Sequence, residues 1–314
     1  MYALNPISEA VIKDWPIRQG KKKSAFRKWF VQELKKNHCS VNVETGRFIL
    51  KNNNIIVGNI EKARYIFTAH YDTPFKMLFP NIVAPLNLGL TMLYSAAVAA
   101  AALAIAQATA FVFGMLFASY SWIYWFKGIV FWFVLLGCFF SWPNRHNYND
   151  NTSGLVGVLE LLLHPSIKNR EDVAFVFFDN EELGLLGSGL FNQMHQSALR
   201  ETFVINFDCI GEGGHVLLVM NQRMHNYVKT SAELQKLSQS LKKNSNSKFL
   251  IYSDKDAFYP SDQFHFTNGI GVAAMQKSRK GVFYIDKIHT SRDLYLNREN
   301  IYKIKEFFMY FLNQ

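Results

Sequence analysis

The chain has 314 residues, and 49% of them are hydrophobic, which is enough for a core in one large α/β domain or two small ones and excludes a disordered protein. The 34 Lys and Arg residues outnumber the 24 Asp and Glu residues, so the formal net charge is +10. Such a charge suits nucleic acid, anionic lipid or a plain basic surface, and it does not choose among them. Cys39, Cys138 and Cys209 form no Cys-x-x-Cys pair, which argues against a disulfide framework or a thiolate zinc site and favours a reducing compartment.

The N-terminal segment does not resemble a secretory signal, because Glu9, Lys13 and Asp14 interrupt any hydrophobic run. A helix is predicted from Ser24 to Lys36, directly after the basic run Lys21 to Lys23. The basic residues of this region form either a solvated helix face or a contact with anionic lipid headgroups.

A first strand is predicted from Arg64 to Ala69, and it ends in His70-Tyr71-Asp72. This order places an imidazole at a strand terminus and a carboxylate two residues further on. A metal-bound histidine commonly donates its second N–H to such a carboxylate, although a His and an Asp this close also occur by chance.

A long apolar stretch follows, from Asn81 to Trp142, in which Lys127 is the only charged residue. The hydrocarbon core of a bilayer is ~30 Å thick and needs about 20 apolar residues per helix, so the stretch can hold two spans. Either the spans run from Leu86 to Gln107 and from Thr109 to Phe126, or the second runs from Trp122 to Trp142. The alternative is a buried or dimerising helical hairpin in a soluble protein, which would have to cover a large apolar patch.

The polar segment Asn149 to Gly154 comes next and precedes a predicted helix from Leu155 to Leu163. Its carboxylate, Asp150, is in a position where an acidic residue ordinarily caps a helix. Taken alone, the segment therefore predicts a cap as readily as a ligand.

A strongly apolar strand is predicted from Val173 to Phe178, and it runs directly into Asp179-Asn180-Glu181-Glu182. Three acidic residues so close together repel one another unless cations lie among them. The alternative is a solvated acidic turn at the start of a helix.

The rest of the chain continues the alternation of strands and helices. Strands are predicted at Thr202–Phe207, Val216–Met220 and Gly271–Ala274, and helices at Val228–Leu241 and Ile301–Leu312. This alternation predicts an α/β fold with a mixed, largely parallel central sheet sandwiched by helices, and ligands at the carboxyl ends of the strands. Asp208 follows one predicted strand, and His289 lies shortly before Asp293.

This set of residues resembles the M28 family of zinc aminopeptidases, a group of co-catalytic two-metal metallopeptidases, over most of the chain from Tyr65 to Leu312 apart from the apolar stretch. Each motif is weak alone, but six in the family's order are a strong signal. They are His70 to Asp72, Asp150 to Gly154, Glu181 to Ser188, Asp208, Ser261-Asp262 with Phe264 and Phe266, and His289-Thr290.

The resemblance implies two Zn²⁺ or other first-row divalent ions, with Asp150 between them. His70 and Asp208 would complete one metal site, and Glu182 and His289 the other. Oxygen and imidazole ligands without a thiolate agree with such ions.

The same resemblance implies that Glu181 is the general base, that Asp72 orients His70, and that Asp293 lies behind the ligands near His289. Substrate contacts are expected from Ser261, Asp262, Phe264 and Phe266. The two phenylalanine rings could instead be plain core residues.

The apolar stretch lies between His70 and Asp150, which must meet at the same metal pair, so the chain has to leave the membrane on the side where it entered. We therefore expect one catalytic domain, residues 1–80 and 143–314, with an inserted transmembrane or membrane-embedded hairpin at residues 81–142. Lys76, Arg145 and the basic N-terminal helix flank this insert, and positive flanks favour a cytoplasmic catalytic domain.

The predicted function is that of a two-zinc metallopeptidase, an aminopeptidase that removes N-terminal residues from short peptides at a membrane by attack of a hydroxide held between the metals. The alternatives are a single-zinc glutaminyl cyclase-like enzyme and a catalytically silent membrane receptor or scaffold. No nucleic-acid-binding motif accompanies the basic charge, so the expected partners are peptide and membrane lipid, and the oligomeric state is open.

Overall fold

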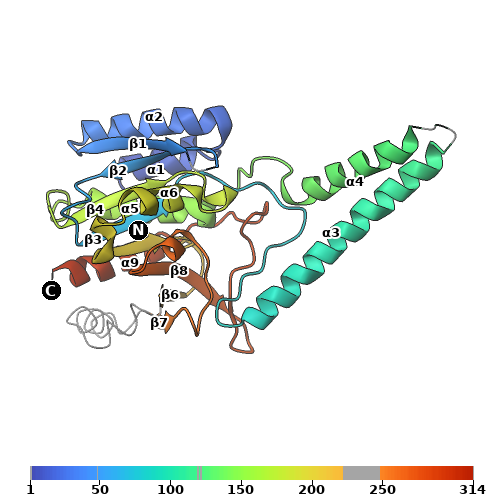
Figure 1. The fold of residues 1–314 in the computed structure, drawn as a ribbon. Helices are drawn as coiled ribbons and strands as arrows, with labels where there is room; N and C mark the ends of the chain where they lie inside the picture. Colours follow the sequence, from blue (N-terminus) through green and yellow to red (C-terminus); the bar gives the residue numbers. More distant parts are fainter. Residues whose placement is uncertain (1, 48, 119, 121, 222–247, 314) are drawn as a thin grey trace.

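The central sheet is mixed, and its middle strands are parallel (Figure 1). The computed structural model describes every residue except 1, 48, 119, 121, 222–247 and 314. Within these residues the sheet order is β1-β2-β4-β3-β5-β8-β6-β7, with β9 paired to β8. The strands are β1 Val41–Arg47, β2 Lys51–Val57, β3 Tyr65–His70, β4 Val173–Phe178, β5 Phe203–Phe207, β6 His215–Met220, β7 Phe249–Ser253, β8 Gly269–Lys277 and β9 Phe283–Tyr284. The four neighbours β4, β3, β5 and β8 are parallel, which confirms the predicted fold class.

Helices cover both faces of this sheet. They are α1 Pro6–Asp14, α2 Gly20–Lys36, α5 Gly154–Leu162, α6 Leu186–Met194 and α9 Arg298–Leu312. Strand side chains alternate between the faces. Phe67 of β3 packs beside Phe308 of α9 on one face, whereas Ile66 belongs to the cluster that contains Phe191 of α6 on the other. Both clusters are buried, so the ends of the central strands are held rigidly.

Outside the apolar insert, each predicted strand or helix within the described residues agrees with an observed one to within a few residues. Strands β1, β2, β7 and β9 and helices α1 and α6 were not predicted. Strand β1 reads Val-Asn-Val-Glu-Thr-Gly-Arg, a polar composition that suits its place at the edge of the sheet. Strand β2 reads Lys-Asn-Asn-Asn-Ile-Ile-Val, and its first half is polar although Asn52 and Asn54 are buried. The helix predicted at Val228–Leu241 lies outside the described residues.

The apolar insert forms a hairpin that projects from the domain, with helix α3 at Leu88–Leu116 and helix α4 at Ile123–Phe139 (Figure 1). Helix α3 has 29 residues and is long and apolar enough to cross a membrane, whereas α4 has 17. Helix α3 continues through Gln107, so the arrangement with a return at Thr109 is wrong. The sequence there is rich in alanine and contains no Gly or Pro that would end a helix.

Most of the hairpin surface is apolar and exposed. Ala102, Ala106 and Ala110 are buried at four-residue spacing, which lets α3 and α4 approach closely. In contrast, Trp125 is 86% exposed and Phe133 is 79% exposed. The hairpin is therefore not a buried core element of this chain, and its surface needs a lipid or protein environment.

Candidate metal centre

The carboxyl ends of the parallel strands bring the predicted ligands to one edge of the sheet. His70 ends β3, and Asp208 follows β5. Helix α5 begins against the end of β5 at Gly154, where a Cβ would lie 2.1 Å from the Phe207 carbonyl oxygen. Only glycine permits this approach, which places Asp150, in the turn before α5, in the same group of side chains as Asp208.

Asp150 lies between the two histidines. Its Oδ1 is 3.5 Å from His70 Nε2, and its Oδ2 is 3.0 Å from His289 Nε2. Asp208 Oδ1 lies 3.9 Å from His70 Nε2, and Glu182 Oε2 lies 3.4 Å from His289 Nε2. Potential ligand atoms of His70, Asp150 and Asp208 all lie within 4.8 Å of one another, and so do those of Asp150, Glu182 and His289. A third group of this kind consists of His70, Glu181 and Glu182. The structure thus brings the five predicted ligands together, and Asp150 is common to two of the groups.

Several atoms of these groups are buried without a hydrogen-bond partner among the described residues. They are both ring nitrogens of His70, Oε1 of Glu182 and Oδ1 of Asp208. Buried polar atoms are normally paired, because an unpaired one loses its hydration. A divalent cation would satisfy them, so the residues fit the metal ions that the sequence predicts.

The buried ionisable groups of the site also favour a bound cation. Burial, together with neighbouring carboxylates, raises the pKa of Glu181 and of Glu182 well above the usual range. Burial lowers the pKa of His70, but Glu181 and Asp150 more than offset this effect, so the pKa is raised well above that of a free imidazole. So many acidic groups in one place are stabilised by positive charge, which a metal ion supplies.

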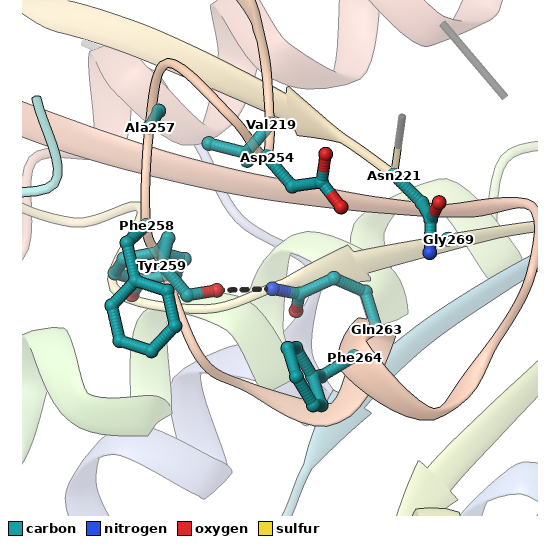
Figure 2. A pocket seen from close by; sticks show the side chains of 9 residues that line it. All are labelled: Val219, Asn221, Asp254, Ala257, Phe258, Tyr259, Gln263, Phe264 and Gly269. Carbon is teal, nitrogen blue, oxygen red and sulfur yellow. Dashed lines mark hydrogen bonds between the residues drawn. The ribbon is translucent and has the colours of Figure 1, made fainter. Parts of the chain in front are cut away.

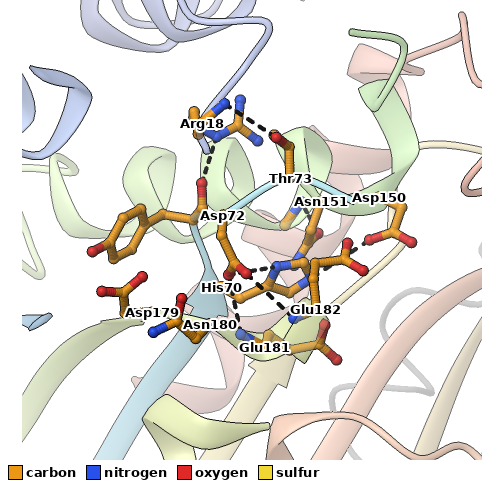
Figure 3. A network of polar contacts seen from close by, with 12 residues as sticks. Arg18, His70, Asp72, Thr73, Asp150, Asn151, Asp179, Asn180, Glu181 and Glu182 are labelled. Carbon is orange, nitrogen blue, oxygen red and sulfur yellow. Dashed lines mark hydrogen bonds and ion pairs between the residues drawn. The ribbon is translucent and has the colours of Figure 1, made fainter. Parts of the chain in front are cut away.

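Asp72 connects two parts of the site (Figure 3). Its carboxylate oxygens accept the backbone N–H groups of Glu181, at 3.2 Å, and Glu182, at 3.3 Å. Its Oδ1 also lies 3.5 Å from His70 Nδ1, which is the contact expected of a residue that orients a metal-binding histidine.

The carboxylate of Asp293 contacts the turn before α5, a role that the sequence did not indicate. Its buried carboxylate accepts the backbone N–H of Asn149 at 2.7 Å and that of Asp150 at 3.0 Å. It therefore fixes the turn that carries the shared carboxylate. The order of residues could not show this, because Asp293 is close to His289 in sequence but far from Asp150.

The side chains of the acidic run after β4 point in different directions, because the backbone turns at Asn180. Asp179 points toward helix α2, where its Oδ1 lies 2.6 Å from Lys23 Nζ, and Arg27 is 3.9 Å from its Oδ2. Asn180 then adopts a positive φ of 56°, which turns the chain toward Glu181. Part of the basic run of α2 therefore pairs with this acidic segment rather than forming only a solvated face.

Arg18 is a buried residue of this region that no sequence motif singles out. Its Nε donates to the carbonyl of Tyr71 at 2.6 Å, and its Nη2 donates to Oγ1 of Thr152 at 3.1 Å. Burial lowers the pKa of the guanidinium to about 10. The Arg18 side chain thus connects the segment after His70 to the segment after Asp150.

The four predicted substrate contacts have different environments. Ser261 and Asp262 are buried, and burial raises the pKa of Asp262 to about 7. Phe266 is a core residue that stacks on Phe178 with ring centroids 6.0 Å apart. Phe264 is 65% exposed.

A cavity of about 180 Å³ lies beside Phe264 (Figure 2). Phe258 and Tyr259 line it as well, and the Tyr259 hydroxyl donates to the carbonyl of Asp208 at 3.3 Å. Gln263 donates to the Tyr259 carbonyl at 2.6 Å and closes the turn. This cavity therefore adjoins the backbone of one candidate ligand, and of the two predicted rings only Phe264 lines it.

The class of this protein follows from its similarity to a known family. The sequence model of peptidase family M28 matches residues 135–312, which is more than half of the chain. The chain belongs to peptidase family M28. M28 is a family of metallopeptidases. The chain is therefore a member of a family of peptide hydrolases, as the sequence predicted.

Two curated relatives are named vacuolar membrane protease. The one from Vanderwaltozyma polyspora is 35% identical over 79 residues, 25% of this chain and 8% of the relative. The one from Yarrowia lipolytica is 34% identical over 89 residues, 27% of this chain and 9% of the relative. The M28 chain thus spans less than a tenth of the length of these relatives.

Solved structures agree in fold. Glutaminyl cyclase of Porphyromonas gingivalis superposes with a TM-score of 0.62 at 15% identity, covering 98% of this chain and 95% of the cyclase. LapB of Legionella pneumophila superposes with a TM-score of 0.56 at 13% identity, covering 98% of this chain and 70% of LapB. At such identities the likeness establishes the fold alone.

Proposed function

We propose that this M28 chain is a two-zinc aminopeptidase that acts on short peptides at a membrane surface. The observation that supports it best is the position of Asp150, whose two carboxylate oxygens face different histidines, at 3.5 Å from His70 and 3.0 Å from His289. A carboxylate placed in this way suits two metal ions rather than one. A single-zinc glutaminyl cyclase-like site would need fewer of these acidic ligands.

One ion would be held by His70, Asp150 and Asp208, and the other by Asp150, Glu182 and His289. Bound zinc would supply Lewis-acid polarisation of the peptide carbonyl and would lower the pKa of water at the site. The buried carboxylates hold this charge in place, and Asp72 keeps His70 oriented. The excess of acidic groups also favours the free N-terminal ammonium of a peptide.

Glu181 is the proton carrier of the proposed reaction. Its Oε2 lies 3.8 Å from His70 Nε2, so its carboxylate is next to the five predicted ligands without being one of them. The Glu181 carboxylate accepts a proton from the attacking water and then donates it to the leaving amine nitrogen. General acid–base transfer of this kind contributes about 10²- to 10⁴-fold in rate.

The hairpin would embed in the membrane while residues 1–80 and 143–314 form the catalytic domain. At 1.5 Å per residue, α3 is roughly 43 Å long and α4 roughly 25 Å, against a hydrocarbon core of ~30 Å. Aromatic side chains at the ends of α4, such as Trp122 and Trp142, would extend the second span to the interfaces. Lys127 lies one turn inside α4 near the hairpin tip, from which its ammonium can reach the headgroups. Lys76 and Arg145 flank the root of the hairpin, and such positive flanks support a cytoplasmic position for the catalytic domain.

The test is metal stoichiometry and hydrolysis of amino-acid arylamides, measured on detergent-purified full-length protein. We expect about two zinc ions per chain, cleavage of free but not N-acetylated substrates, and loss of both properties in Asp150→Ala. Asp14→Ala is the matched control, because Asp14 is an exposed residue at the end of α1. One zinc ion with cyclisation of N-terminal glutamine would replace the proposal by a cyclase, and an inactive, metal-free wild type that zinc cannot restore would replace it by a receptor.

A further inference from the structure

The turn between β8 and β9 is fastened to the root of the membrane hairpin. Val83, shortly before α3, exchanges two backbone hydrogen bonds with Ile285, shortly after β9, at 2.9 and 2.8 Å. Lys277 of β8 pairs with Phe283 of β9, and residues 278–282 form the turn between them. This turn lies beside Leu90 in the first turn of α3. This geometry fixes the turn at the level where α3 begins (Figure 1).

A groove of about 400 Å³ lies between this turn and α3. Its floor is apolar and includes Ile82, Leu90, Val282 and Tyr284. Leu90 belongs to the first turn of α3, and one turn further Leu93 is 71% exposed. The apolar floor therefore continues along the helix into the membrane-facing surface.

The rim of the groove is basic. Arg279 and Lys280 are exposed and line it, and neither forms an ion pair with any residue that the structure describes. Lys277 lies close by, with its Nζ 5.1 Å from the centre of the Phe283 ring. Residues 276–285 contain three basic side chains and no Asp or Glu. The local charge is therefore positive and uncompensated.

We propose that this groove is a binding site for one anionic phospholipid. Its phosphate would lie between Arg279 and Lys280, and an acyl chain would lie over Val282 and Leu90 into the bilayer. The inference rests on the proposed embedding of the hairpin, which puts the start of α3 at headgroup depth. A basic rim above an apolar floor that continues into the membrane-facing surface of α3 is complementary to an anionic headgroup above a hydrocarbon chain.

Native mass spectrometry tests this site. The protein is released from micelles that contain equal amounts of dioleoyl-phosphatidylglycerol and dioleoyl-phosphatidylcholine. Wild type should retain one phosphatidylglycerol in preference to phosphatidylcholine. Each basic residue near an anionic surface contributes about fivefold, so Arg279→Gln/Lys280→Gln should weaken this preference roughly 25-fold. Val282→Trp, which fills the groove and leaves both charges, should also abolish retention.

The matched control is Lys28→Gln/Lys35→Gln, which removes two exposed positive charges from α2, next to the opposite edge of the sheet. It should bind like wild type; an equal loss in this control would mean diffuse attraction and would overturn the site. A wild type without preference, or a Val282→Trp variant that still retains the lipid, would overturn it too. Carbonate extraction of membranes tests the hairpin separately. Release of the wild-type protein by carbonate would contradict the proposed membrane embedding itself.

Discussion

The backbone N–H of Met77 donates a hydrogen bond of 2.8 Å to the carbonyl of His289, so the segment that leads into the apolar hairpin is bonded directly to a candidate metal ligand. The returning segment makes a similar contact, because Asn144 Nδ2 donates to the carbonyl of Thr290 at 3.0 Å. His289 itself has a positive φ of 59°, a conformation that its surroundings must hold in place. Both arms of the hairpin root therefore fix the loop of one ligand.

We accordingly expect Asn144→Ala to weaken zinc binding by about tenfold. Loss of a buried hydrogen-bond donor leaves its acceptors unpaired and costs ~1–3 kcal/mol, and here part of that cost falls on the loop that positions His289. Chelator competition measures the effect. Asn87→Ala is the control, because Asn87 caps α3 at the same root through the N–H of Leu90 and contacts no candidate ligand. Equal zinc affinity in wild type and Asn144→Ala would show that the root does not support the site.

Arg18 provides a second test of how the ligands are positioned. Arg18→Met should lower the free energy of unfolding by about 2–4 kcal/mol, because the carbonyl of Tyr71 and other buried acceptors lose a charged donor. It should also lower zinc affinity, which a purely structural role far from the site would leave unchanged. Arg18→Lys should rescue only part of both losses, since an ammonium cannot reproduce the guanidinium fork. Denaturant unfolding and chelator competition measure them, with the exposed Arg200→Met as the control.

The sequence predicted those parts of the site whose residues follow buried strands. His70 and Asp208 end or follow β3 and β5, and these strands are apolar enough to be recognised from their composition. The order of motifs then indicated the remaining ligands. Arg18 and Asn144 could not be found in this way, because their partners are 53 and 146 residues away along the chain and no local pattern records such contacts.

The fold was predictable in its centre and not at its margins. Strand β1 and the first half of β2 are polar enough to read as loops, yet β1 pairs with β2 as the edge strand of the sheet. Asn52 and Asn54 of β2 are buried, which their composition does not indicate. Phe264 and Phe266 show the same limit for side chains. They are two residues apart and chemically identical, but Phe266 is buried against Phe178 and Phe264 lines a cavity, a distinction that depends on tertiary packing.

Glu181→Gln should separate catalysis from metal binding. The amide keeps the size of the side chain but cannot take a proton from water, so kcat should fall by about 10²- to 10⁴-fold with zinc content unchanged. Glu182→Gln is the matched comparison one residue further on, and it should lose zinc together with activity because Glu182 Oε2 lies beside His289 and Asp150. If both variants kept full zinc and equal activity, the proposed roles of the two glutamates would be wrong.

Removal of the metal should destabilise the folded chain. Metal ions that bind the native state alone raise the free energy of unfolding by RT ln(1 + [metal]/Kd), which is about 4 kcal/mol at 1,000 times Kd. Chelation should therefore lower Tm by several degrees, and added zinc should restore it. Asp150→Ala removes the carboxylate common to both metal-ligand groups, so its Tm should respond little to chelator or zinc. The exposed Asp14→Ala variant should shift as wild type does, and a wild-type Tm that chelation leaves unchanged would mean that the buried carboxylates are stable without the ions.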